Sequence, residues 1–374
     1  MKILYISTVN FTEEDMNTDG ITKKILGQID AMMSLGMDVD YVGRSEGAVF
    51  LYSKGNRRKL CESRNSSYLD NIHISKVVLA LLDDEKWDAI YVRYCGLDWN
   101  SLKLFEACRK KKIKVYLELP TYPYRKEMFG RITTLLRYLI SSIYKPKLKK
   151  FLTAIITYTD YDEIYGVPTI RIENGININS VPVYRNDDLS ELNLIIVGRM
   201  QKWHGFDRLL VGLGKYYESE EGKKKVFLDI VGDGSVLDKY KEIVKKLNME
   251  DYVTFHGKKS GEELDRIFKK AHVSINSLGL HRIGLKDAST IKAKEYVARG
   301  LPIVFATSEV LLSENLFFCH RVPSDESLVD IEQILIFYEN VLTYDDYQKA
   351  IRKYAEENMT WEKQMKKVFN NNVR

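Results

Sequence analysis

The chain has 374 residues, of which 45% are apolar and 29% are charged, and its formal net charge at pH 7 is +5. This length exceeds what one hydrophobic core usually supports, so we expect a globular protein with two domains. The charge excess is small and dispersed. It argues against a nucleic-acid-binding protein but suits phosphate ligands or an anionic lipid surface.

The cysteines and the start of the chain indicate the compartment. None of the four cysteines occurs in a C-x-x-C or Cys/His metal-binding pattern, which is typical of reduced thiols. The first apolar run is typical of a strand, ends at Asn10 and is followed by acidic residues, so we expect no signal peptide. No apolar run approaches the roughly 20 residues that span a bilayer. The sequence therefore predicts a cytoplasmic protein with at most a peripheral contact with a membrane.

Strand-like runs alternate with helical patterns along the whole chain, which predicts an α/β fold with parallel, doubly wound sheets. Between the early strands, helical patterns cover residues 21–35 and 97–111. The expected strands are 3–7, 39–42, 89–93, 114–118, 154–158 and 169–172, followed by 192–197, 226–231, 253–256, 272–276 and 302–305.

Two successive series of strands predict two domains. The apolar periodicity is interrupted within residues 177–191, where turn-forming residues gather. We expect an N-terminal domain at 1–176, a linker at 177–191, a C-terminal domain at 192–345 and a helical tail at 346–374. Ligands of open α/β sheets bind beyond the carboxyl ends of the strands, so two facing domains place the site in the cleft between them.

The motif after the strand at 192–197 reads Gly198-Arg-Met-Gln-Lys-Trp-His. A strand that ends in Gly-Arg brings a guanidinium to the sheet edge, where its planar fork can bind a diphosphate through two hydrogen bonds. Lys202 and His204 are further donors, and the charge of His204 would depend on pH. The alternative is that Arg199 forms an ion pair on the surface.

The most informative segment, residues 287–304, reads Asp-Ala-Ser-Thr-Ile-Lys-Ala-Lys-Glu-Tyr-Val-Ala-Arg-Gly-Leu-Pro-Ile-Val. Ser289 and Thr290 suit a helix N-cap, and Gly300 suits the helix end. The first turn presents free backbone N–H groups and the positive end of the helix dipole, which favour a phosphate. Glu295, about two turns along, can accept hydrogen bonds from a hydroxyl-rich ligand. Together these features indicate a nucleotide sugar; the alternative is an ordinary βα unit with a capped helix.

This segment resembles the signature of the GT-B glycosyltransferases of family 4, in which Glu, seven residues and a second Glu precede a small-residue helix, Gly and Pro-Val. The run from Ser289 to Tyr296 is closer still to a polysaccharide-assembly branch, in which Lys is frequent at the position of Lys292. The resemblance implies the GT-B fold, with two Rossmann-like doubly wound domains facing across a cleft and a C-terminal helix that crosses back onto the N-terminal domain.

The resemblance also implies roles for individual residues. Glu295 matches the Glu that holds the donor ribose, and Asp287 takes the place of the Glu that contacts the transferred sugar, although it is one methylene shorter. Arg199 matches the Arg that neutralises the leaving diphosphate, while His204 stands at the usual Lys position. The groups expected at the diphosphate are Arg199, Lys202 or His204, Lys292 and the amides of Ser289, Thr290 and Ile291.

Shorter motifs extend the resemblance. Gly232 belongs to a Gly-Asp-Gly turn common in the family, and Gly257 and Lys258 follow a strand whose backbone meets the base. Gly20 matches the glycine loop between the first strand and the first helix, which approaches the donor phosphate or the acceptor. For these motifs the alternative is a plain turn. Glu118 stands where many relatives have His; it can bond the transferred sugar, or act as a weak base on the acceptor hydroxyl if burial raises its pKa.

Two D-x-D patterns, at 38–40 and 160–162, match the metal-binding motif of the other large glycosyltransferase fold. The first starts a strand whose alternate residues point to opposite faces, and the second lies in a Tyr-rich turn, so we interpret both as chance. The GT-B resemblance implies that side chains and a helix terminus stabilise the diphosphate. We therefore expect no metal and no cofactor besides the donor substrate.

Residues 128–143 show an apolar stripe at helical spacing, opposite Thr133, Arg137 and Ser141, and a basic run follows. Two interpretations stay open: the stripe packs against the sheet, or it docks on an anionic membrane leaflet with help from the lysines. The lysines of the run are Lys145, Lys147, Lys149 and Lys150.

The sequence thus predicts a hexosyltransferase-type enzyme that moves a sugar from a nucleoside diphosphate sugar to a saccharide acceptor. Retention at the anomeric carbon, a lipid-linked acceptor and a part in surface polysaccharide biosynthesis are implied by the resemblance. Glu118, Asp287 and Arg199 are the expected catalytic residues, without a covalent nucleophile. The alternatives are a sugar-nucleotide epimerase on the same fold and a non-catalytic subunit that binds a glycan or a true transferase.

Overall fold

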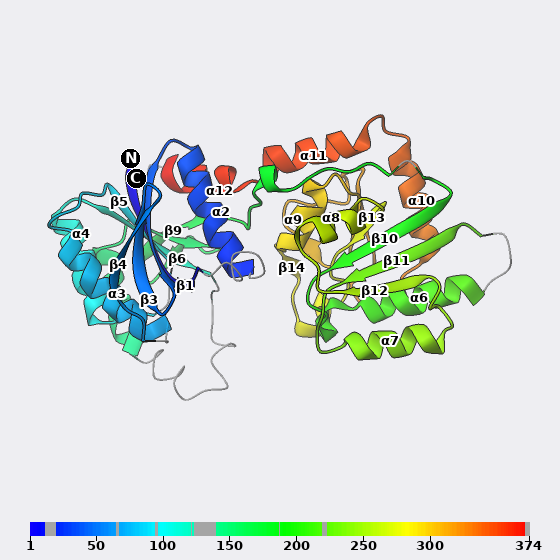
Figure 1. Ribbon diagram of the computed structural model, residues 1–374, viewed down its shortest axis with the longest axis horizontal. Helices are drawn as coiled ribbons and strands as arrows, with labels where there is room; N and C mark the ends of the chain where they lie inside the picture. Colours follow the sequence, from blue (N-terminus) through cyan, green and yellow to red (C-terminus); the bar gives the residue numbers. More distant parts are fainter. Residues whose placement is uncertain are drawn as a thin grey trace. The chain divides into compact units, whose positions relative to one another are not determined.

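The computed structural model describes residues 1–11, 20–64, 67–93, 96–120, 122, 140–186, 188–218 and 223–370, which form two compact units (Figure 1). The first unit comprises Met1–Asn174 and Trp361–Arg374, and the second comprises Gly175–Thr360. The segment predicted as one helical tail, 346–374, is divided between them, so that its first helix belongs to the second unit and its last helix to the first.

In the described part of the first unit, the sheet has the strand order β4-β3-β2-β1-β5-β6-β7-β9-β8. Within this order, the six neighbouring strands β2-β1-β5-β6-β7-β9 run parallel, as predicted. β3 and the two edge strands, β4 and β8, pair in antiparallel fashion and were not predicted. The strands are β1 (Lys2–Asn10), β2 (Asp38–Ser45), β3 (Ala48–Ser53), β4 (Asn56–Glu62), β5 (Ala89–Arg93), β6 (Lys114–Leu119), β7 (Ala154–Thr157), β8 (Glu163–Ile164) and β9 (Val167–Arg171), and the helices are α2 (Gly20–Ser34), α3 (Ser67–Leu81), α4 (Trp99–Lys110), the 3-10 helix η2 (Lys145–Lys150) and α12 (Trp361–Asn370).

Helices cover both faces of this sheet, with α2 and α12 on one face and α3 and α4 on the other (Figure 1). The two helices of the first pair approach closely because α2 has a glycine where they meet. A Cβ atom on Gly27 would lie 2.5 Å from the Trp361 ring. The Gln364 side chain of α12 also accepts a hydrogen bond from the backbone N–H of Glu173 at 3.0 Å. The final helix is thereby fixed within the first unit.

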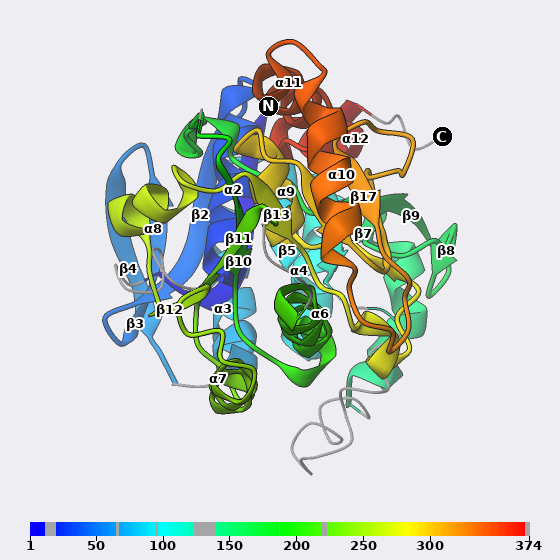
Figure 2. The same cartoon turned by 90° about the vertical axis from the view of Figure 1, so that its right-hand side faces the viewer.

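The second unit contains, within the described residues, a parallel sheet in the order β12-β11-β10-β13-β15-β17 and a small parallel pair, β14-β16. Helices α6 and α7 lie on one side of the larger sheet, and α9 and α11 lie on the other (Figures 1 and 2). The strands are β10 (Glu191–Val197), β11 (Lys225–Val231), β12 (Val253–Gly257), β13 (Val273–Ile275), β14 (Asp287–Ala288), β15 (Ile303–Phe305), β16 (Ser308–Glu309) and β17 (Cys319–Arg321), and the helices are η3 (Ile178–Ser180), η4 (Lys202–His204), α6 (Phe206–Glu218), α7 (Leu237–Lys246), α8 (Gly261–Phe268), η5 (Leu280–Ile283), α9 (Ile291–Ala298), α10 (Ile331–Leu342) and α11 (Tyr347–Asn358).

The carboxyl ends of these parallel strands collect at one edge of the sheet. Gly198 follows β10, and Gly232 follows β11, with φ angles of +144° and +135°. A Cβ atom on Gly232 would lie 1.9 Å from the carbonyl oxygen of Gly198. Only glycine allows both this conformation and this approach. The backbone of the turn after β10 therefore packs directly on that of the turn after β11, and Gly198 of the former lines the candidate site.

The predicted amphipathic segment is only partly described, because residues 128–139 lie outside the described residues. In its last turn the side chains do not follow the interpretation in which the stripe packs against the sheet. Ser141, expected on the polar face, is buried, and its hydroxyl accepts a hydrogen bond from the backbone N–H of Leu97 at 3.0 Å. Ile143, expected in the apolar stripe, is 66% exposed. Ser141 satisfies a buried backbone N–H, and this hydrogen bond determines the orientation of the turn more than the apolar pattern does.

Lys145, the first lysine of the basic run, is not available to a membrane surface. Its side chain is buried, its ammonium lies 5.3 Å from the centre of the Tyr165 ring, and burial lowers its pKa to about 8. Lys145 is the first residue of the 3-10 helix η2, in which Lys145 and Leu148 are the buried residues. The other three lysines of the run, Lys147, Lys149 and Lys150, are exposed. No helix among the described residues is both long enough and apolar enough to cross a membrane.

Candidate active site

A pocket of about 570 Å³ opens at the carboxyl edge of the larger sheet in the second unit. The turn after β10, the 3-10 helices η4 and η5, and the segment leading into α9 provide its walls. Its lining residues are Gly198, Arg199, Trp203, His204, Ser277, Leu280, Ile283, Leu285, Asp287, Ala288, Ser289, Thr290 and Lys292. The structure therefore brings together six of the residues expected at the site, namely Arg199, His204, Asp287, Ser289, Thr290 and Lys292.

Arg199 reaches the pocket from the end of β10. Its side chain is exposed, and within the described part of the chain the guanidinium makes no hydrogen bond or ion pair. The alternative interpretation, a surface ion pair, thus finds no partner there. Asp287, another residue of the pocket lining, is likewise exposed at the start of β14. A cationic fork and a carboxylate are therefore both available to a ligand.

His204 lines the pocket as a neutral donor. Burial and the nearby Lys292 ammonium lower the pKa of His204 to about 3, so its predicted pH-dependent charge is wrong. Its Nδ1 accepts a hydrogen bond from the backbone N–H of Gln201 at 3.4 Å, within a reciprocal cap of η4. The proton of the neutral ring is consequently on Nε2. The imidazole can donate a hydrogen bond to an anion but contributes no positive charge.

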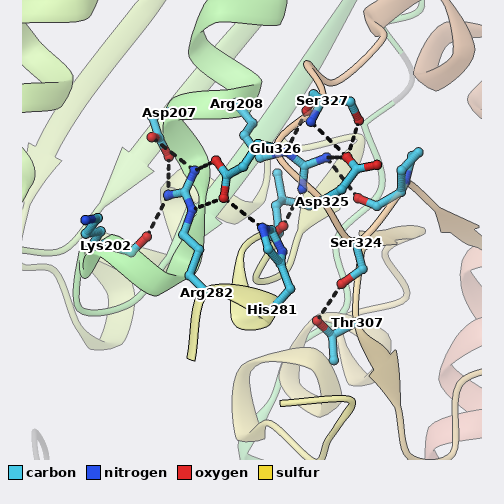
Figure 3. Close-up of polar contacts among 12 residues, drawn as sticks. Lys202, Asp207, Arg208, His281, Arg282, Thr307, Ser324, Asp325, Glu326 and Ser327 are labelled. Atoms are coloured by element: carbon cyan, nitrogen blue, oxygen red, sulfur yellow. Dashed lines mark hydrogen bonds and ion pairs between the residues drawn. The ribbon is translucent and has the colours of Figure 1, made fainter. Parts of the chain in front are cut away.

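Lys202, the other residue proposed for this position, is exposed and does not line the pocket. Its backbone carbonyl instead accepts a hydrogen bond from Arg282 at 2.8 Å (Figure 3). The same guanidinium forms ion pairs with Asp207 at 2.9 Å and with Glu326 at 2.6 Å. Arg282 therefore ties η5 to η4 and to the start of α6, and so fixes two walls of the pocket.

A second arginine, Arg208, continues this network (Figure 3). It is 3% exposed, and its guanidinium donates to the backbone carbonyls of Leu278, Pro323 and Ser327. Both arginines position pocket walls, yet neither was predicted. Each stands alone in a helical pattern or turn, and its partners are 44 or more residues away, so no local motif signals its role.

The segment that enters α9 is capped as the sequence predicts. Thr290 is the N-cap, and its hydroxyl accepts a hydrogen bond from the backbone N–H of Ala293 at 3.4 Å. However, the backbone N–H of Thr290 donates to the buried carboxylate of Glu309 at 2.5 Å. The prediction that this amide binds a phosphate is therefore wrong, because a protein carboxylate already uses it. The amides of Ile291 and Lys292 belong to the first turn and have no partner inside the helix.

Lys292 extends from α9 into the pocket. Its ammonium donates to the hydroxyl of Ser277 at 2.8 Å and lies 5.3 Å from the centre of the Phe206 ring. Desolvation lowers the pKa of Lys292 to about 7, although the Glu309 carboxylate acts in the opposite direction. This cation therefore titrates near neutral pH in the unliganded protein.

The remaining candidates of the second unit lie outside the pocket lining. Glu295 accepts hydrogen bonds from Arg299 on the next turn of α9, at 3.0 Å from Nη2. Gly232 packs on Gly198, and its backbone N–H donates to the carbonyl of Gly257 at 2.7 Å. Lys258 is exposed, 3.9 Å from Asp233. Gly232 and Gly257 thus support the turn that carries Gly198 and Arg199. Glu295 and Lys258 do not line the pocket.

Glu118 and Gly20 belong to the first unit. Gly20 is the first residue of α2 rather than part of a loop, and residue 19 lies outside the described residues. Glu118 is completely buried, and its carboxylate accepts hydrogen bonds from Arg93 at 2.6 Å and Tyr91 at 2.8 Å. Burial raises its pKa, but the charges of Lys24 and Arg93 outweigh that effect and hold the pKa below its usual value. The predicted role as a weak base with a raised pKa is therefore wrong.

The D-x-D carboxylates are engaged elsewhere. Asp40 accepts a hydrogen bond from the Trp87 indole at 2.8 Å, and Asp160 pairs with Arg171 at 2.6 Å. No group of three His, Cys, Asp or Glu side chains within the described ranges is arranged to hold a metal ion.

Solved structures with the same arrangement extend over nearly the whole chain. A glycosyltransferase from Rickettsia africae ESF-5 is 12% identical, with a TM-score of 0.63 over 99% of this chain and 97% of that one. Sucrose-phosphate synthase from Thermosynechococcus elongatus is 14% identical, with a TM-score of 0.61 over 99% and 98%. Alr3699/HepE from Anabaena, solved in complex with UDP, is 13% identical, with a TM-score of 0.60 over 99% and 100%. These likenesses establish the fold.

The two Rossmann-like units and the pocket at the strand ends thus define a GT-B protein, as the sequence predicts. Residues 186–327 match the model of the family Glycosyl transferases group 1, in agreement with the resemblance seen in the sequence. The chain is a glycosyltransferase, which confirms the predicted enzyme class. No curated protein matches the sequence significantly.

Proposed function

We propose that the enzyme transfers a sugar from a nucleoside diphosphate sugar to a saccharide acceptor, and that the pocket of the second unit binds the donor. The observation that carries this proposal is the convergence of Arg199, Lys292 and the first turn of α9 on one cavity. Two cations and a helix N-terminus are what a diphosphate requires. The structural likeness to a protein solved with UDP supports the same donor class.

The proposed mechanism is electrostatic. As the bond between the anomeric carbon and the diphosphate oxygen breaks, the electron pair stays on the diphosphate, and negative charge grows beside Arg199 and Lys292. The neutral His204 adds a hydrogen bond from Nε2. Charge-assisted hydrogen bonds of this kind each contribute about 1.5–3 kcal/mol. We assign Asp287, which also lines the pocket, to the hydroxyl groups of the transferred sugar.

Retention at the anomeric carbon, a lipid-linked glycan acceptor and a role in surface polysaccharide assembly are further parts of the proposal. They rest on the resemblance of residues 289–296 to the polysaccharide-assembly branch. We also propose that the enzyme is cytoplasmic and uses no metal ion. A sugar-nucleotide epimerase and a non-catalytic binding subunit are the competing functions.

A panel of nucleoside diphosphate sugars, incubated without acceptor, tests the proposal. Slow release of free sugar and nucleoside diphosphate is expected for one donor, with and without excess chelator. An epimeric sugar as the product would identify an epimerase, and the absence of turnover with every donor would favour a binding subunit. Activity that is lost in chelator and restored by Mg²⁺ or Mn²⁺ would contradict the metal-independent mechanism.

Glu295 tests the proposed ribose contact. Glu295→Gln is expected to weaken binding of the nucleoside diphosphate about tenfold in calorimetry, because a charged hydrogen-bond acceptor becomes neutral. Asp265→Asn is the control, since Asp265 is the other carboxylate partner of Arg299, at 2.7 Å. Equal losses of affinity in the two variants would show that Glu295 acts only by holding Arg299.

The exposed lysines of η2 test the proposed membrane contact. Changing Lys147, Lys149 and Lys150 to Gln is expected to reduce sedimentation with anionic vesicles about 10- to 100-fold, because each lysine near such a surface contributes about 1 kcal/mol. The control changes three exposed lysines of α7 in the second unit, Lys241, Lys245 and Lys246. Wild-type protein that ignores anionic vesicles at low salt would rule out this contact.

A further inference from the structure

Behind the wall formed by Asp287–Ala288, a compact group of polar side chains is buried. Glu309, Lys294 and Asn276 are each no more than 2% exposed. They come from three separate segments: the end of β16, the middle of α9 and the residue after β13. Buried charges and amides of this kind remain only where their hydrogen bonds are satisfied.

Glu309 is the centre of this group. Its Oε1 accepts the backbone N–H of Thr290 at 2.5 Å, and its Oε2 lies 3.1 Å from the side-chain amide of Asn276 and 3.2 Å from the hydroxyl of Thr290. The strand that carries Glu309 also pairs with the pocket wall, since β16 runs parallel to β14 and the backbone N–H of Val310 donates to the carbonyl of Ala288 at 2.7 Å. Side chain and backbone thus hold the same short segment.

Lys294 balances the charge of this carboxylate. Its ammonium lies 3.8 Å from Oε1 of Glu309 and donates to the hydroxyl of Ser289 at 3.0 Å. The pair is neutral as a whole, so it does not repel an anion in the adjoining pocket. A carboxylate beside the first turn of α9 is itself favoured by the helix dipole. The carboxylate of Glu309 also favours the charged form of Lys292 in the adjoining pocket, so geometry and charge have to be tested separately.

We propose that Glu309 is a positioning residue that holds Asp287, Ser289 and Thr290 in the geometry that acts on the donor. This inference rests on the proposed donor site. Glu309 does not line the pocket itself and acts through Thr290, which does, and through the β14-β16 pair. Because Glu309 aligns the groups that act on the donor, its loss reduces kcat more than it weakens donor binding.

Two substitutions separate position from charge. Glu309→Gln removes the charge and replaces one acceptor oxygen by a donor facing Asn276. Glu309→Asp keeps the charge beside Lys294 but is one methylene too short to reach the Thr290 amide. Glu309→Asp is expected to lower kcat about 10- to 100-fold, with KM changing less than about threefold. Glu309→Gln is expected to lower kcat at least as much and also to raise KM, because the carboxylate that favours the Lys292 ammonium is lost. The control is Glu314→Gln, an exposed residue paired with Arg321 and outside the pocket.

Hydrogen exchange of the backbone segment 286–292 provides a readout that needs no turnover. Faster exchange there in both variants, with unchanged exchange in α10 and the same behaviour in Glu314→Gln and wild type, is the expected result. Full activity or unchanged exchange in Glu309→Asp would overturn the proposal, because the carboxylate would then serve only as a counter-charge for Lys294. Wild-type protein without turnover on any donor would instead refute the proposed function, while exchange still decides the role of Glu309.

Discussion

Arg199→Ala is expected to lower kcat by about 10²- to 10³-fold while the affinity for the nucleoside diphosphate falls about tenfold or less. The guanidinium is exposed in the pocket and has no protein partner among the described residues, so its N–H groups can all donate to a ligand. The charge on the diphosphate increases as the bond to the sugar breaks, and an interaction that strengthens at that moment appears in kcat.

The measurement pairs steady-state kinetics with calorimetry of the nucleoside diphosphate. Arg266→Ala is the control, because Arg266 is an exposed arginine of α8 in the same unit, paired only with Glu262 on its own helix among the described residues. It is expected to behave as wild type. If Arg199→Ala retained near-normal turnover, the diphosphate would be neutralised by other groups, and the proposed position of the donor would have to change.

The parallel sheets were predictable because their strands are continuous apolar runs between glycines and polar turns. The strand predicted at 89–93 coincides with β5, and the strand predicted at 192–197 lies within β10. The β3-β4 hairpin escaped prediction because β4 is an exposed edge strand with the sequence Asn-Arg-Arg-Lys-Leu-Cys-Glu, which has no apolar alternation. The one signal in the sequence was Gly55 in the turn between β3 and β4. In the structure, Lys54 and Gly55 have φ angles of +48° and +79°.

Contacts within one turn of helix were also predictable, whereas contacts between distant segments were not. The N-cap at Thr290 follows from the residue type and the helix that begins after it. The partner of its amide, Glu309, is 19 residues away, and nothing in the local pattern indicates that this carboxylate turns inward. Glu118 illustrates the same limit. The weak-base role required burial to raise its pKa, but the direction of the shift is set by Lys24 of α2 and Arg93 of β5, which are distant in the sequence.

Donor affinity is expected to fall as the pH rises above 7, because Lys292 must be protonated to bind a diphosphate. Desolvation lowers the pKa of Lys292 to about 7 in the unliganded protein, and a bound diphosphate raises it again. Below pH 7 the ammonium is already present. Above pH 7 binding must include the uptake of a proton, so affinity decreases by up to about tenfold per pH unit until the pKa of the complex is reached.

Calorimetry of the nucleoside diphosphate at pH 6 to 9, in buffers with different ionisation enthalpies, measures both the affinity and the protons taken up. Lys292→Met is expected to bind about 10- to 100-fold more weakly at pH 6 and to show no proton uptake above pH 7, since a neutral side chain replaces the charged donor. The terminal phosphate of the ligand titrates near pH 6 and strengthens binding as the pH rises, which is opposite in sign, so the range above pH 7 isolates Lys292. His204→Gln is the matched control: the pKa of His204 is about 3, so this variant should keep the wild-type pH dependence. An affinity that stays constant between pH 7 and 9 in the wild type would show that Lys292 does not meet the diphosphate, and would leave Arg199 and the first turn of α9 as its ligands.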